Sequence, residues 1–305
     1  EWEVVSSTEN TFPTGQATKR IDFVVTLKTP PTTVVKSNVI YNLDGVNVAI
    51  TSDHYPLYCD FKKPTGLEEY PKAEGDLRIG NYFLTYCKGT DGVIDYDRTG
   101  RIIAKMNADI VCLQGLDKET ERSEGIDQLN VLAQKANMHD YFAKAIDYKG
   151  GEFGVGILTK EEPVSVDRYQ MAGKSEMRAA MVVEYEKFVV ASTNFDTDMA
   201  KRIEALQTLE TKLSAYNKPA FLLGYFNEGD LESEFFQMVK SNWNLLSADK
   251  STEVSGKKRR LDFIVSLKSH NVNVTQADVI ESLSGVDVTV ASTHYPLFCD
   301  FSGLK

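Results

Sequence analysis

Two histidines of this chain stand in nearly the same motif, one near each end of the sequence. Residues 50–61 read I-T-S-D-H-Y-P-L-Y-C-D-F, and residues 290–301 read V-A-S-T-H-Y-P-L-F-C-D-F. Histidine can accept or donate a proton near neutral pH, and a neighbouring carboxylate can support such a step. The first motif has Asp53 before His54, whereas the second has Thr293 before His294. The two copies therefore differ by one group that is capable of chemistry.

These motifs close a longer internal repeat. Arg20–Phe61 aligns without a gap with Arg260–Phe301, and 21 of the 42 positions are identical. The second copy ends a long block that begins near Asp76, and the repeated unit occurs only at the two ends, which excludes a solenoid. The economical interpretation is that the chain carries parts of two homologous domains.

We therefore expect three regions along the chain. Residues 1–62 would be the C-terminal tail of an upstream domain, residues 63–75 a linker rich in Pro, Gly and charge, and residues 76–305 a complete domain. A tail made of strands and loops would expose apolar edges if it stood alone. We expect it to pack against the remainder of the upstream domain, the second domain, another chain, or a domain-swapped copy.

The block from residue 76 alternates apolar, strand-like runs with amphipathic, helix-like ones. Strands are predicted at residues 77–86, 109–114, 154–158, 179–185, 188–193, 220–223, 261–267, 286–291 and 297–301, and helices at residues 95–108, 126–136, 198–216 and 231–241. Short apolar strands interleaved with helices are typical of an α/β protein in which helices cover a central sheet.

Composition narrows the class of protein. The net charge is -10 and 42% of the residues are hydrophobic, which is ordinary for a globular protein. An acidic chain argues against a basic groove for nucleic acid, although a metal can offset phosphate charge in a hydrolase. No apolar run approaches the roughly 18 residues of a membrane span.

The ends of the predicted strands form an ordered series of motifs. In chain order they read L-T-Y-C at 84–87, I-V-C-L-Q-G-L-D at 110–117, G-G-E-F-G-V-G-I-L at 150–158, A-S-T-N-F-D at 191–196, L-L-G-Y-F-N at 222–227, R-R-L-D-F-I-V at 259–265 and S-T-H-Y-P-L at 292–297. The series resembles that of the endonuclease/exonuclease/phosphatase superfamily, metal-dependent phosphoesterases related to pancreatic deoxyribonuclease. Its spelling is closest to that of secreted bacterial members.

The resemblance implies a fold, a location and a mechanism. The fold would be a four-layered α/β sandwich, with two facing mixed sheets flanked by helices, and the protein would be exported to the periplasm or cell surface. Family members cleave a P–O bond by in-line attack of water. A Glu and an Asn hold Mg²⁺ or Mn²⁺, a His paired with an Asp acts as base, and a G-D-x-N element orients water and phosphate.

This chain departs from the family pattern at several of those positions. The replaced groups are Cys87 for the Asn, Gly115 for the Glu, Asn194 for a His, Tyr225 for the Asp of G-D-x-N, and Thr293 for the Asp of S-D-H. Asn227, Asp262 and His294 are kept, and the N-terminal tail keeps Asp22, Asp53 and His54. Removing one member of a catalytic unit costs about 10³- to 10⁶-fold in rate. We therefore expect residues 76–305 to be catalytically degenerate, with no metal or other cofactor.

Three other interpretations stay open from the sequence. The protein could be a Mg²⁺-dependent phosphodiesterase or phosphatase whose activity resides in the complete upstream domain. The old site could have a rescued metal, held by Asp117, Glu119 or Glu121, or a new chemistry that uses Cys87. The chain could also be a surface module that binds a ligand such as a glycan through aromatic residues, for which the candidates are Tyr148, Phe153, Tyr169, Tyr225 and Phe226.

Overall fold

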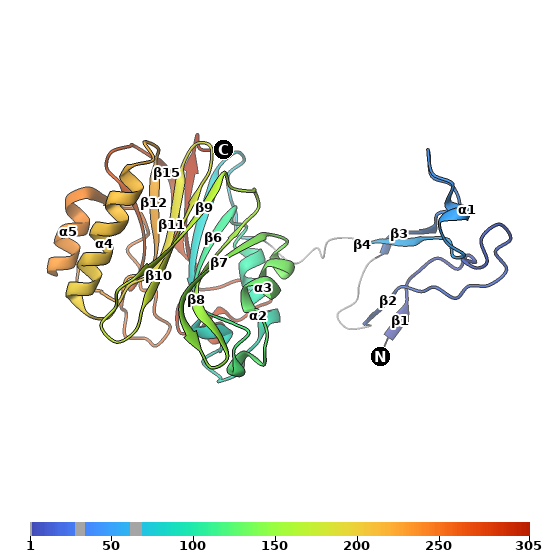
Figure 1. The fold of residues 1–305 in the computed structure, drawn as a ribbon, viewed down its shortest axis with the longest axis horizontal. Helices are drawn as coiled ribbons and strands as arrows, with labels where there is room; N and C mark the ends of the chain where they lie inside the picture. Colours follow the sequence, from blue (N-terminus) through green and yellow to red (C-terminus); the bar gives the residue numbers. More distant parts are fainter. Residues whose placement is uncertain (1, 28–33, 62–68) are drawn as a thin grey trace. The chain divides into compact units, whose positions relative to one another are not determined.

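The chain forms two compact units in the computed structural model, which describes residues 2–27, 34–61 and 69–305 (Figure 1). The units are Glu1–Leu67 and Glu68–Lys305. Residues 63–68, the first part of the predicted linker, lie outside the described residues, as does residue 62 of the predicted tail. The rest packs on the second unit, because the Tyr70 hydroxyl donates to Asp278 at 2.8 Å and Lys72 pairs with Asp109 at 2.8 Å. The second unit therefore begins earlier than the predicted Asp76.

Two six-stranded mixed sheets form the centre of the second unit. One has the order β13 (Trp243–Leu245), β14 (Asp262–Leu267), β12 (Ala220–Tyr225), β11 (Val189–Asn194), β10 (Arg178–Glu184) and β9 (Ser165–Met171). The other has the order β15 (Asn273–Val279), β16 (Leu297–Ser302), β5 (Leu77–Phe83), β6 (Ile110–Lys118), β8 (Gly151–Thr159) and β7 (His139–Tyr148). Strands β5 and β6 are parallel, as are β11 and β12, and the other neighbours are antiparallel.

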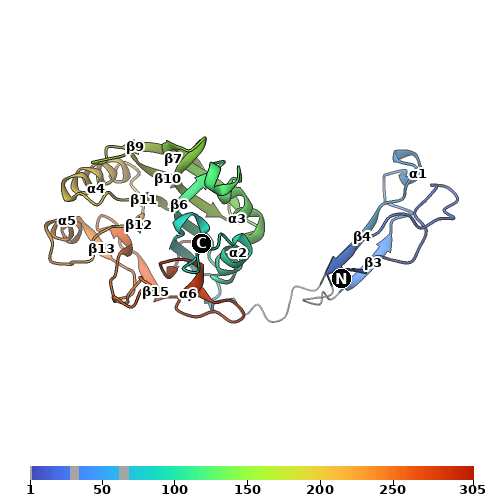
Figure 2. The same cartoon turned by 90° about the horizontal axis from the view of Figure 1, so that it is seen from below.

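Helices cover the outer face of each sheet (Figure 2). Helices α4 (Met199–Ser214) and α5 (Glu234–Asn242) lie on one side, and α2 (Tyr96–Lys105) and α3 (Gln128–Ala136) lie on the other. Shorter helices are η1 (Thr85–Cys87), η2 (Glu121–Ser123) and α6 (Val288–Ala291). Apolar side chains fill the space between the sheets and the space under each helix pair. The predicted four-layered α/β sandwich is therefore confirmed.

The helices begin where the sequence offers a capping carboxylate. Asp95, Asp127 and Asp198 each accept a hydrogen bond from a backbone N–H in the first turn of α2, α3 and α4. None of the helices within the described residues has the length and hydropathy needed to cross a membrane.

The secondary-structure prediction was wrong for one predicted strand and for the sheet edges. Residues 286–291 were predicted as a strand, but residues 288–291 form helix α6, whose first turn is capped by the side chain of Asp287. Strands β7, β9, β13 and β15 were not predicted, and these are the four edge strands of the two sheets. An edge strand has one neighbour and is partly exposed, so its sequence lacks the continuous apolar run of an inner strand.

The N-terminal unit repeats the pairing of the last strands of the second unit. Strand β1 (Trp2–Val4) pairs with β2 (Val25–Leu27), and β3 (Val34–Val39) pairs with β4 (Leu57–Phe61); helix α1 spans Val48–Thr51. Trp2 lies opposite Leu27 as Trp243 lies opposite Leu267. The β3–β4 pair has a register shift between Val34 and Lys36, and the β15–β16 pair has one at the equivalent place. The repeat seen in the sequence is thus also a repeat of backbone structure.

A buried ion pair ties the first strand of the second unit to its last. Arg78 on β5 and Asp300 on β16 are 0% and 1% exposed, and two guanidinium nitrogens donate to the carboxylate at 2.6 and 2.7 Å. The remaining guanidinium protons are donated to the backbone oxygens of Tyr70, Pro71 and Met106. Every charged atom of the pair is satisfied, which is the condition under which a buried ion pair is tolerated.

We predict that Asp300→Asn lowers the free energy of unfolding of the second unit by about 3–5 kcal/mol, because it leaves the Arg78 charge buried without a counter-ion. Urea denaturation followed by circular dichroism measures the change. Asp60→Asn is the matched control, since Asp60 is the equivalent residue of β4 and is exposed. Equal effects of the two substitutions would contradict the assignment of the pair as a buried structural element.

Candidate functional site

A histidine and a carboxylate meet at the end of the sandwich where β5, β12 and β14 end or begin. Asp262, the first residue of β14, is fully buried, and its Oδ2 lies 2.6 Å from Nδ1 of His294, which is 4% exposed. The Ser292 hydroxyl donates to the backbone oxygen of Phe83 at 2.6 Å and accepts from the His294 N–H at 3.2 Å. These bonds fix the imidazole beside the end of β5.

Two aromatic rings pack on this histidine. The centroid of the Phe83 ring lies 4.7 Å from that of His294 and 4.7 Å from that of Tyr225, and the Tyr225 and His294 centroids lie 4.8 Å apart. Burial, and then the charge of Asp262, raises the pKa of the Tyr225 hydroxyl. The three rings form a compact aromatic cluster where His294 would otherwise face solvent.

The second carboxylate oxygen of Asp262 makes no hydrogen bond. This atom, Oδ1, is buried and has no hydrogen-bond partner among the described residues. A single buried carboxylate oxygen is a weak site for Mg²⁺, which needs several oxygen ligands. Across residues 2–27, 34–61 and 69–305, no group of three or more His, Cys, Asp or Glu side chains is placed to hold a metal ion.

Neighbouring strands bring other predicted positions to the same edge. Asn194 at the end of β11 lies opposite Tyr225 of β12, and Tyr225 lies opposite Asp262 of β14. Asn227 donates its side-chain N–H to the Phe195 backbone oxygen at 2.7 Å and to Asn194 Oδ1 at 3.4 Å. The amide of Asn227 is therefore used to join the ends of β11 and β12.

Gly115 lies beside Phe83 in a bulge of β6. The strand register shifts between Gln114 and Leu116, and Gly115 has a φ of 73°. A Cβ at this position would lie 3.3 Å from the Thr85 backbone nitrogen and 3.4 Å from the Phe83 ring. A side chain at residue 115 is therefore disfavoured both by the backbone conformation and by the space that Phe83 occupies. On the same side of the site, the Thr293 and Thr85 hydroxyls are 3.0 Å apart.

Cys87 does not lie with the other predicted site residues, and this placement is corrected. It is fully buried among apolar residues under α2 and α3, and burial raises the pKa of its thiol. The residue that contacts His294 is Phe83, four positions earlier, because β5 ends there rather than at residue 86. The sequence held a weak signal for this, since Asn81-Tyr82-Phe83 also carries the tyrosine of the T-Y-N pattern, which Thr85-Tyr86-Cys87 matches at two positions.

The three carboxylates that the sequence offers as alternative metal ligands are either bound to an arginine or exposed. Asp117 is fully buried, and Arg122 donates to its two oxygens at 2.5 and 2.8 Å. Glu119, just after β6, and Glu121, the first residue of η2, are exposed. The guanidinium of Arg122 also stacks on Tyr86 and Tyr148 at 3.9 and 4.4 Å from the ring centroids. Asp117 thus holds a structural arginine.

The aromatic candidates for ligand binding are also dispersed. Phe226 is fully buried and packs on Phe195, Phe235 and Phe263. Tyr225 belongs to the aromatic cluster at His294. The ring centroids of Tyr148 and Phe153 lie 6.5 Å apart, with Arg122 over both rings, so these two candidates are neighbours whereas Phe226 is buried elsewhere.

The N-terminal unit repeats the His–Asp pair with fewer aromatic neighbours. His54 Nδ1 lies 2.8 Å from Asp22 Oδ2, and the two side chains are 36% and 35% exposed. A hydrogen bond from Thr11 is the main cause that lowers the pKa of Asp22, and His54 contributes. Asp53, whose counterpart in the second copy is Thr293, is exposed and precedes His54 in the chain. The three predicted residues of this unit therefore lie close together.

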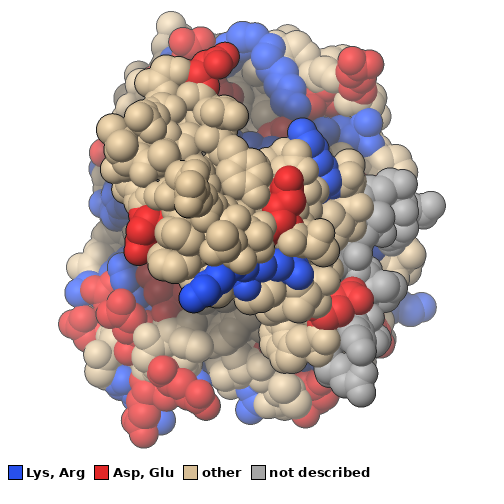
Figure 3. Space-filling model, turned by 90° about the vertical axis from the view of Figure 1, so that its right-hand side faces the viewer, with Lys and Arg blue, Asp and Glu red and all other residues tan. Residues whose placement is uncertain are grey.

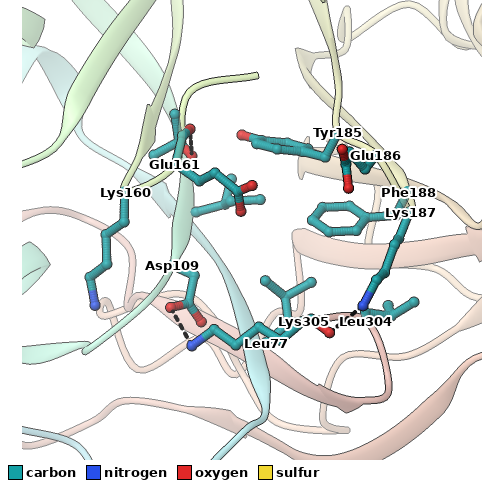
Figure 4. A pocket seen from close by; sticks show the side chains of 12 residues that line it. Leu77, Asp109, Lys160, Glu161, Tyr185, Glu186, Lys187, Phe188, Leu304 and Lys305 are labelled. Atoms are coloured by element: carbon teal, nitrogen blue, oxygen red, sulfur yellow. Dashed lines mark hydrogen bonds and ion pairs between the residues drawn. The ribbon is translucent and has the colours of Figure 1, made fainter. Parts of the chain in front are cut away.

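A separate hollow lies at the other end of β5. It has a volume of about 340 Å³ and is lined at its base by Leu77, Tyr185, Phe188 and Leu304 (Figure 4). Lys305 pairs with Asp109 at 3.0 Å on its rim. Because Leu77 begins β5 and Phe83 ends it, this hollow is separated from His294 by the length of the strand.

An ion pair on the rim of the His294 site gives a pH test. The Arg259 guanidinium donates to both oxygens of Glu253 at 2.6 and 2.7 Å and lowers the pKa of Glu253 from 4.5 to about 2. Ionised Glu253 therefore stabilises the fold fully above pH 4.5, and this contribution is lost as the pH falls towards 2.

We predict that Glu253→Gln lowers the free energy of unfolding at neutral pH by about 1 kcal/mol or less, since solvent screens the half-exposed Arg259. The difference from wild type shrinks as the pH falls from 4.5 towards 2. Urea titrations at several pH values measure it. A difference independent of pH would mean that the carboxylate charge is not what stabilises this loop.

Comparison with solved structures identifies the fold. An endonuclease/exonuclease/phosphatase from Beutenbergia cavernae aligns with a TM-score of 0.65 and 19% identity over 76% of this chain and 73% of that chain. The human Nocturnin catalytic domain with bound sulfate aligns at 0.55 and 20% identity over 75% and 95%. A mannosyl-6-phosphatase from Bacteroides thetaiotaomicron aligns at 0.57 and 15% identity over 74% and 99%.

Sequence comparisons add nothing to this identification, because neither protein-family models nor curated proteins match the chain. Identities of 15–20% establish a common fold and not a common activity. Residues 69–305 therefore have the DNase I-like sandwich fold that is found in endonuclease/exonuclease/phosphatase structures.

Proposed function

We propose that residues 76–305 are a catalytically degenerate member of the endonuclease/exonuclease/phosphatase family that acts as a binding, scaffold or accessory module. The observation that carries the proposal is the aromatic cluster of Phe83, Tyr225 and His294. In this position the family mechanism needs an open, polar site for a metal, a water molecule and a phosphate.

Three features of the site support the loss of hydrolysis. Gly115 and Phe83 supply no oxygen ligand, and the left-handed backbone at Gly115 disfavours any residue that could. Tyr225 fills the space next to His294 with a half-buried ring. His294 is 4% exposed, so its imidazole has little access to an attacking water.

The same features explain why the His–Asp pair can persist without catalysis. The bond between Asp262 and His294 joins β14 to the loop before β16. The rings of Phe83 and Tyr225 pack on each other and on the imidazole of His294. A buried carboxylate without its partner costs several kcal/mol, so the pair has a structural reason to be retained. Retention of His294 is therefore compatible with an accessory role.

We predict that Mg²⁺ and Mn²⁺ bind residues 1–305 more weakly than about 0.1 mM, because the site lacks enough oxygen ligands. Isothermal titration calorimetry measures the affinity. The control is Asp262→Asn, with its folding checked by circular dichroism. Tighter binding that this substitution abolishes would overturn the proposal, whereas tighter binding that survives it would locate the metal elsewhere.

A second candidate function is supported by the N-terminal unit. Here His54 and Asp22 are 2.8 Å apart, Asp53 is present, and the pair is about one-third exposed rather than buried. These groups fit the proton-transfer part of a metal-dependent phosphodiesterase or phosphatase that hydrolyses P–O bonds. Such activity would reside in a complete domain to which residues 1–62 contribute.

We predict that the 305-residue chain does not hydrolyse bis(p-nitrophenyl) phosphate in the presence of Mg²⁺ or Mn²⁺. In a longer protein that includes the upstream reading frame, His54→Gln abolishes turnover and His294→Gln leaves it unchanged, since the two histidines occupy equivalent sites. Turnover by the longer protein that depends on His294 would contradict both candidate functions. Absence of turnover in the longer protein would count against the second candidate alone.

A further inference from the structure

The N-terminal unit exposes apolar side chains whose counterparts are buried in the second unit. Trp2, Phe23 and Phe61 are 65%, 51% and 42% exposed. The equivalent residues Trp243, Phe263 and Phe301 are 1%, 0% and 0% exposed. The same residue types on equivalent strands are therefore exposed in one unit and buried in the other. The difference must come from what covers each surface.

The covering elements can be read from the second unit. The Trp243 indole donates to Glu210 at 3.3 Å, the Phe263 ring packs on Phe226 and Phe236, and the Phe301 ring packs on Phe221. All of these neighbours lie within residues 69–242, which come before the repeated strands. Nothing in the described part of the N-terminal unit corresponds to that segment.

Residues whose neighbours lie within the repeat itself behave differently. Val39, Val48 and Tyr55 form a small core in the N-terminal unit and are 7%, 5% and 9% exposed. Val279 and Val288, the counterparts of the two valines, are 2% and 1% exposed. The unit is therefore folded like its counterpart, and the difference is confined to the surface that faces residues 69–242 in the complete copy.

Two open strand edges border this surface. In the second unit β14 pairs with β13 and β12, and β16 pairs with β15 and β5. Within the described part of the N-terminal unit, β2 pairs with β1 alone and β4 pairs with β3 alone. An unpaired edge beside apolar side chains is a surface that another strand can extend.

The exposed surface of the N-terminal unit is also chemically complementary to a segment that resembles residues 69–242. Asp60 is exposed on β4, and its counterpart Asp300 is paired with Arg78 of β5. A matching first strand would thus bring a basic residue to Asp60, and a matching helix would bring an acceptor to the Trp2 indole. Figure 3 shows one face of the molecule with the charged side chains coloured, on which uncharged residues cover a broad area with few acidic or basic ones between them.

We propose that the N-terminal unit is a docking surface for one occupant: a segment homologous to residues 69–242 that precedes Trp2 in the same polypeptide. It would add strands to the free edges of β2 and β4, cover Trp2, Phe23 and Phe61, and place an arginine or lysine at Asp60. The inference rests on burial and strand pairing and is independent of whether either site is catalytic.

The test compares the 305-residue chain with a protein extended through the upstream reading frame. Acrylamide quenching reports the two tryptophans, and Trp2→Phe leaves only the buried Trp243 as a reference. We expect Trp2 to be quenched in the 305-residue chain and protected in the extended protein. Phe23→Glu should leave the thermal midpoint of the 305-residue chain unchanged and lower that of the extended protein.

Val35→Glu is the matched control, because Val35 is 65% exposed and its counterpart Thr275 is also exposed. It should change neither protein. Equal effects of Phe23→Glu and Val35→Glu in the extended protein would overturn the proposal, as would a reading frame without a homologous segment. Protection of Trp2 in the 305-residue chain would also overturn it. If that protection increases with concentration the occupant is a second copy, and if it does not the occupant lies within the chain.

Discussion

Strands from the last part of the second unit complete both of its sheets. Strand β14 pairs with β12 in one sheet, and β16 pairs with β5 in the other, so residues 262–302 hold the two halves of the sandwich together. The Arg78–Asp300 pair fixes one end of this closure, and the Asp262–His294 pair fixes the other. This strand pairing accounts for the burial of the core, the position of His294 and the exposed apolar surface of the N-terminal unit.

The chemistry of the site follows from where those strands meet. His294 is brought to Asp262 by the loop before β16 and to Phe83 by the hydrogen bond from Ser292. In a hydrolytic site this junction would be lined with oxygen and nitrogen ligands. Here Phe83 and Tyr225 pack on the imidazole, so two aromatic rings contact it at this junction.

The two copies of the repeat show how context sets burial. Phe23 follows Asp22, and Phe263 follows the equivalent Asp262. In each copy an arginine guanidinium lies 4.7 Å from the centroid of the phenylalanine ring. One is half exposed and the other is in the core, because only the second has β12 and α5 beside it. Local geometry is thus encoded within the repeat, whereas the core requires the preceding segment.

The sequence by itself determined the inner architecture and the residue types at the strand ends. Continuous apolar runs identified the central strands, amphipathic runs identified α2 and α4, and Gly115, Tyr225 and Thr293 were visible without coordinates as departures from the pattern that the sequence resembles. Only the tertiary structure decided that Phe83 rather than Cys87 contacts His294, that the weakly patterned edge strands β7, β9, β13 and β15 exist, and that Trp2 is exposed while Trp243 is buried. These properties depend on neighbours that are distant in the chain, and a local pattern does not record them.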